Sequence, residues 1–152
     1  LPLLRYKLRC GDPSNEVLLE CCAGLLALAP TRTLPLLQEL LEGADAPRRE
    51  AAALALGGSR LAEAVPLLVR LSERLPPHEV GVAYTALAML RSGPALEHLL
   101  GLIAAAPLSR ALAVLRALAI HRYDDALRAR TLAAVGARGD AALRRAADEV
   151  LA

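Results

Sequence analysis

The fold is decided by a stretch in the first half of the chain, LPLLQELLEGADAPRREAAALALGG (residues 34–58). Two apolar segments of helical length lie on either side of a turn sequence, Gly43-Ala44-Asp45-Ala46-Pro47. Glycine, aspartate and proline are the residues that end one helix and begin the next. The stretch therefore predicts a pair of short helices, near residues 32–42 and 47–57.

The same pattern returns about every 32 residues along the chain. The four residues that open the stretch, Leu34–Leu37, have counterparts at steps of 33, 31, 32 and 32 residues. These counterparts begin at Leu1, Val65, Glu97 and, in degraded form, Ala129. Independently, Gly11-Asp12 returns as Gly139-Asp140 after 128 residues, which is four steps of 32, and each aspartate is expected to cap the helix that follows it. Such a period is typical of proteins in which helix pairs stack on one another.

Helical phase supports the same interpretation in the second helix of each pair. The positions two, three, six and seven residues after Glu16, Arg49, Val80, Leu112 and Arg144 are all apolar, as the buried face of a helix requires. Helices are expected near 1–9, 13–29, 32–42, 47–57, 60–75, 78–91, 94–105, 108–121, 124–137 and 140–151. We predict an all-α fold in one domain, residues 1–152, with five repeats near 1–31, 32–58, 59–92, 93–122 and 123–152. Because the chain opens on Leu1, we expect it to be part of a longer protein.

Composition narrows the fold class and the environment. The chain has 35 Leu and 32 Ala among 152 residues and no Phe or Trp, so it lacks the residues that strands favour. The net charge of +2 is too small to indicate a polyanion binder, although residues 1–10 carry three basic groups and no acid. The longest run without a charge has twelve residues, which is too short to span a membrane. Three cysteines without metal-ligand spacing, Cys10, Cys21 and Cys22, predict buried free thiols and a cytoplasmic location.

The central stretch resembles a HEAT repeat of the bacterial, phycobilin-lyase-like type. Five residues match that family's pattern place for place, namely Asp45, Arg49, Leu56, Gly57 and Pro66, and the segment from Asp140 to Leu151 matches it as well. The first repeat departs from the pattern at Glu16, where the family has Arg, and the third and fourth repeats lack both the Asp and the Arg. The resemblance implies a right-handed α-solenoid of about five HEAT-like helix pairs, whose second helices line a concave groove.

Catalytic and metal-binding patterns are scarce. HEAT-type deoxyhypusine hydroxylases use His-Glu pairs on several repeats to hold iron, but here only His78-Glu79 has that order, and Glu97-His98 reverses it. HEAT-like DNA glycosylases need aromatic side chains to hold an unstacked base. The chain offers three Tyr and neither Phe nor Trp. We therefore expect a non-enzymatic protein without a cofactor or a metal.

The second helices place polar side chains on the predicted concave face, which is where a protein or peptide partner is expected to bind. These candidate residues are Glu20, Glu50, Tyr84, Thr85, Arg116, Arg145, Asp148 and Glu149. Tyr84 is the only aromatic residue among them, and Tyr and Arg commonly anchor interfaces. The same residues also fit a merely solvated helix surface. An accessory, lyase-like role with a pigment or cofactor is an alternative, and a basic patch of Arg110, Arg116, Arg144 and Arg145 leaves nucleic-acid binding as a third.

Overall fold

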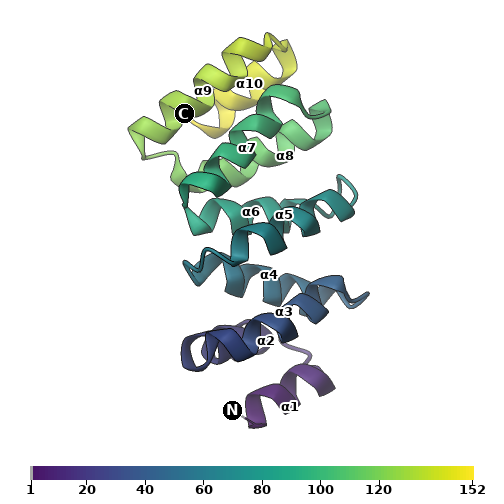
Figure 1. Cartoon of the computed structure of the whole chain (residues 1–152). Coiled ribbons are helices and arrows are strands. Elements are labelled where there is room, and N and C mark those ends of the chain that lie inside the picture. Colours follow the sequence, from purple (N-terminus) through teal and green to yellow (C-terminus); the bar gives the residue numbers. More distant parts are fainter. Residues whose placement is uncertain (1) are drawn as a thin grey trace.

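The computed structural model describes residues 2–152, and these residues form ten α-helices and one short 3₁₀-helix, η1 (Figure 1). The α-helices are α1 (Pro2–Cys10), α2 (Asn15–Leu28), α3 (Pro30–Glu42), α4 (Ala46–Gly58), α5 (Ala64–Arg74), α6 (Gly81–Leu90), α7 (Gly93–Ala105), α8 (Leu108–Leu118), α9 (Asp125–Arg138) and α10 (Ala141–Val150), and η1 is Ala119–His121. The prediction of an all-α fold is confirmed. No helix within the described residues combines the length and the apolar character that a bilayer span requires.

Each odd-numbered helix packs against the even-numbered helix that follows it, so that the chain is organised in helix pairs. The even-numbered helices also pack on one another in chain order, α2 on α4, α4 on α6, α6 on α8 and α8 on α10. Figure 1 shows the pairs following one another along one axis, with the two ends of the chain toward opposite ends of the stack. The even-numbered helices therefore form a continuous inner row that holds most of the buried side chains.

Several helix limits differ from the sequence prediction for local reasons. The helix expected near 60–75 begins at Ala64, because Arg60 has a left-handed backbone with φ 58°. The helix expected near 108–121 is α-helical only to Leu118 and tightens into η1. The first inner helix, expected from residue 13, begins at Asn15.

Side-chain caps lie at the start of three inner helices, α2, α4 and α10. Asp140 accepts hydrogen bonds from the backbone N–H groups of Ala142 at 2.9 Å and Leu143 at 3.1 Å, which confirms its predicted role. Asp12 was expected to cap α2, but that cap is Ser14. Asp12 instead accepts from the Ser14 N–H at 2.9 Å and pairs with Lys7 at 2.7 Å, and the Lys7 hydrogen bond lowers the pKa of its carboxyl.

Small residues let the inner helices approach closely. Most of the alanines along α4 and α6 are buried, and Gly57 of α4 is buried against Ala86 of α6. A Cβ atom added at Gly57 would lie 2.8 Å from both the Cα and the carbonyl oxygen of Ala86. The contact at this point is therefore between two helix backbones.

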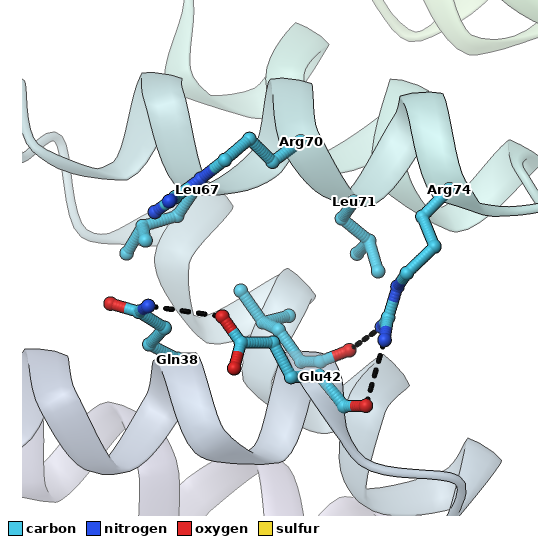
Figure 2. A pocket seen from close by; sticks show the side chains of 7 residues that line it. Gln38, Glu42, Leu67, Arg70, Leu71 and Arg74 are labelled. Atoms are coloured by element: carbon cyan, nitrogen blue, oxygen red, sulfur yellow. Dashed lines mark hydrogen bonds between the residues drawn. The ribbon is translucent and has the colours of Figure 1, made fainter.

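Arginines tie three of the helix pairs to the preceding pair by capping the carboxyl end of an odd-numbered helix. Arg74 donates to the carbonyl oxygens of Leu41 and Glu42 at the end of α3 (Figure 2). Arg138 does the same for Ile103 and Ala106 at the end of α7. The carbonyls at a helix carboxyl end lack partners within the helix and carry partial negative charge. These guanidinium groups therefore stabilise the contacts between pairs.

Arg110 provides the same cap for α5, and its loss is expected to be costly. It donates to the carbonyl oxygens of Ser72 at 2.8 Å and Leu75 at 2.7 Å. It also donates to the hydroxyl of Tyr84 at 3.2 Å. Arg110→Met is expected to lower the free energy of unfolding by about 1.5–3 kcal/mol, measured by urea denaturation. Arg116→Met, at an exposed site on the same helix, is the matched control and should change it by less than about 0.5 kcal/mol. Equal effects of the two substitutions would show that the cap contributes nothing.

The three cysteines differ in exposure, which corrects the expectation that all are buried. Cys21 and Cys22 are buried, whereas Cys10 is exposed at the end of α1. Burial raises the pKa of the Cys22 thiol to about 12, because a thiolate is disfavoured away from water.

Thiol labelling should reveal this difference. In the folded protein a neutral-pH thiol reagent is expected to modify Cys10 rapidly and to reach Cys21 and Cys22 only after denaturant is added. The rates are measured by mass spectrometry of labelled peptides. Labelling of Cys22 as fast as Cys10 in the folded protein would contradict this placement.

Candidate functional site

A groove larger than the other pockets described below runs across the inner row, from α2 over α4 to α6. Its volume is about 820 Å³, which lies in the range of binding sites for small molecules or several side chains. It is lined by Leu19, Glu20, Ala23, Leu26, Ala27, Pro30, Leu54, Ala55, Gly58, Ser59, Leu61 and Met89. Glu20 is the only charged residue in this lining, so the groove is apolar with one acidic group.

Small exposed residues on the inner helices create the groove. Ala27 on α2 and Gly58 on α4 are exposed and small, so they leave space between longer neighbours. Met89 near the end of α6 is 40% exposed and closes the groove on that side. A flexible thioether suits a surface that adapts to different partners.

The predicted row of polar residues is only partly brought together. Glu20 lines the groove, and Glu50 lies on α4 one helical turn before Leu54, in a smaller pocket of about 210 Å³. Thr85 is half-buried on α6. Arg116 is exposed on α8, and Arg145, Asp148 and Glu149 are exposed on α10. None of these last five residues lines the groove.

Tyr84 is not on the surface, and the structure corrects that expectation. Its side chain is 1% exposed, and its hydroxyl accepts the hydrogen bond from Arg110. The residue is therefore buried rather than exposed on the predicted concave face, and with His98 and Arg110 it lines a separate pocket of about 470 Å³. The apolar groove residues Leu54 and Met89 were missed, although Leu54 gave a signal, an apolar side chain at a position where the helical phase calls for a polar one.

The four arginines considered for nucleic acid do not all lie on the surface, because Arg110 is half-buried whereas Arg116, Arg144 and Arg145 are exposed. Arg110 is directed toward carbonyls of α5 and toward Tyr84, as described above. Arg144 donates to the carbonyl oxygen of Gly136 at 3.3 Å. Of the four arginines, only Arg116 and Arg145 make no hydrogen bond of this kind among residues 2–152.

The histidines lie on separate parts of the stack. His78 is exposed beside Glu79, with 3.4 Å between its Nε2 and a carboxylate oxygen. The ring of His121 contacts the carbonyl oxygen of Ala88 at 2.7 Å. Burial lowers the pKa of His98, although the charge of Glu73 acts in the opposite direction. Residues 2–152 contain no cluster of three or more His, Cys, Asp or Glu side chains arranged to hold a metal ion.

A smaller pocket of about 210 Å³ lies between α3 and α5 (Figure 2). Leu41, Leu67 and Leu71 supply apolar side chains to it. The polar groups around it are largely engaged already, since the Gln38 amide donates to the Glu42 carboxylate at 3.0 Å and Arg74 caps α3. This pocket therefore belongs to the packing between helix pairs.

Comparisons of the chain with protein-family models, with curated proteins and with solved structures found no match.

Proposed function

We propose that the chain is a right-handed α-solenoid of about five HEAT-like repeats that acts as a non-enzymatic scaffold in the bacterial cytoplasm. In this proposal the inner helices face a concave groove that binds a protein or peptide segment. The repeat period supports it, as do the stacked inner helices and the arginine caps, which join groups 32 to 38 residues apart. The observation that carries the function is the apolar groove over α2, α4 and α6.

The groove also indicates the chemistry of its partner. An apolar lining calls for apolar side chains on the segment that binds there. Glu20 is the only charged residue of the lining, so the charge within the groove is negative. We therefore propose a segment that carries apolar anchors and at least one basic residue. Electrostatic complementarity of this kind fixes the register of the bound segment.

Capture of a partner by variants of the full chain tests this function. Wild-type chain on a resin is exposed to extract of the source cell, and the retained protein is then bound quantitatively to each variant. Met89→Glu is expected to weaken binding by at least about tenfold, because it places a charge in the apolar groove. Glu20→Lys is expected to weaken it by repelling the basic residue.

Leu132→Glu provides the matched control. Leu132 lies on α9 and is 39% exposed, close to the 40% of Met89, but it is outside the groove. Its substitution should leave binding unchanged. Equal binding by the wild type and by Met89→Glu would contradict the proposal. A chromophore that co-purifies with the wild type and is lost from Met89→Glu would instead favour the accessory, lyase-like role.

A further inference from the structure

A second surface, away from the groove, gathers arginines between α1 and α3. A pocket of about 190 Å³ is lined there by Arg5, Arg9, Arg32, Pro35, Leu36 and Glu39. Arg5 and Arg9 are four residues apart on α1, and Arg32, Pro35, Leu36 and Glu39 share one face of α3. The helices α1 and α3, which belong to consecutive helix pairs, therefore direct their guanidinium groups to the same pocket.

The charges of this pocket do not balance. Three guanidinium groups and one carboxylate line it, which leaves a net charge of +2 at neutral pH. Arg9 and Arg32 are exposed. The ion pairs among residues 2–152 engage other arginines, such as Arg49 and Arg91. Like charges held close together repel one another, so the pocket is a favourable place for an anion.

An unused donor points to the same conclusion. The Arg5 guanidinium is held in place by a hydrogen bond from its Nη2 to the carbonyl oxygen of Arg32 at 3.4 Å. Its Nε is buried and has no acceptor among the described residues. Buried polar groups without a partner are uncommon, and each calls for an explanation. Because protein atoms cover this Nε, the Arg5 side chain would have to turn toward the pocket for an oxygen atom of a bound anion to supply the missing acceptor.

We propose that this pocket binds a phosphate monoester dianion carried on a phosphorylated side chain of a peptide. A phosphoserine carries between 1.5 and 2 negative charges at about pH 7 and three acceptor oxygens, which complements the net charge of +2. Guanidinium groups bind phosphate through paired hydrogen bonds. The pocket is small and has no aromatic residue in its lining, so it offers neither the room nor the stacking surface that a nucleotide base requires.

Calorimetric titration of the full chain tests this site. The probes are inorganic phosphate, O-phosphoserine and a short peptide with phosphoserine at its centre, compared with the same peptide carrying serine or glutamate. The phosphoserine peptide is expected to bind best, the glutamate peptide more weakly and the serine peptide not measurably. Arg5→Gln and Arg32→Gln should each weaken binding by about tenfold or more. Glu39→Gln should strengthen it, because it removes the only negative charge of the pocket.

Two controls separate this site from a general charge effect and from the groove. Arg128→Gln removes an exposed arginine of α9 and should leave the affinity for the phosphoserine peptide unchanged. Met89→Glu should also leave it unchanged, since Met89 lies in the groove and not in this pocket. Circular dichroism confirms that each variant is folded.

Three results would overturn the proposal. One is an affinity that Arg5→Gln and Arg32→Gln leave unaltered, and another is a loss as large with Arg128→Gln as with those two. The third is binding to phosphatidylcholine vesicles that contain phosphatidic acid without binding to the phosphoserine peptide, which would assign the arginines to a lipid surface instead.

Discussion

Tyr84→Ala is expected to lower the free energy of unfolding by about 3–5 kcal/mol, the range found when a large aromatic side chain is removed from a core. Tyr84 is the largest of the fully buried side chains in residues 2–152, with 1% of its surface exposed. Its removal leaves a cavity beside α8 and takes away the hydroxyl that accepts from Arg110. The loss is measured as a shift in the urea denaturation curve followed by circular dichroism.

Tyr84→Phe separates the hydrogen bond from the packing. Phenylalanine keeps the ring and loses only the hydroxyl, while Arg110 retains its bonds to the carbonyls of Ser72 and Leu75. A loss of only about 1 kcal/mol is therefore expected. If Tyr84→Ala unfolded no more easily than the wild type, the side chain would be on the surface, as the sequence alone indicated.

Gly57→Ala is the second substitution with a large expected effect, although it adds only one methyl group. The new Cβ would lie 2.8 Å from the backbone of Ala86, and a backbone cannot turn aside as a flexible side chain can. The helices α4 and α6 would have to separate, with the loss of packing along both. We expect a destabilisation of about 3 kcal/mol, measured by the same denaturation experiment.

Gly58→Ala is the matched control for this prediction. It is the next residue of α4, is exposed, and a Cβ at this position meets no atom of the described residues within 4 Å. Alanine favours helix over glycine, so Gly58→Ala should be neutral or stabilising by up to about 1 kcal/mol. Similar effects at the two glycines would mean that α4 and α6 do not approach as closely as described.

Much of the architecture could be predicted from the sequence because periodicity reports burial. The turn around Asp45 and the cap at Asp140 depend on residues within one turn of the helix, so local chemistry indicates them. The buried face of each inner helix could be predicted because a helix repeats every 3.6 residues. The four positions of α4 that follow this phase, Ala51, Ala52, Ala55 and Leu56, are all buried.

The features that could not be predicted from the sequence depend on contacts between residues far apart in the chain. The sequence alone predicted Tyr84 on the surface. In the fold its hydroxyl accepts a hydrogen bond from Arg110, which lies 26 residues later in the chain. Ser14 caps α2, whereas Asp12 pairs with Lys7 on the preceding helix. The groove could not be predicted from the polar row. Met89 lines it because α6 packs beside α4, and the sequence of α6 alone does not show that packing.

Site-specific photo-crosslinking tests most directly whether the groove over α2, α4 and α6 is the partner-binding surface. A photoreactive amino acid is introduced in place of Met89 in one chain and in place of Leu132 in another, and each is irradiated with the captured partner. These positions have nearly equal exposure, 40% and 39%, but only Met89 lines the groove. We predict a crosslinked complex from position 89 and none from position 132. Crosslinking from position 132 alone would contradict the proposed function.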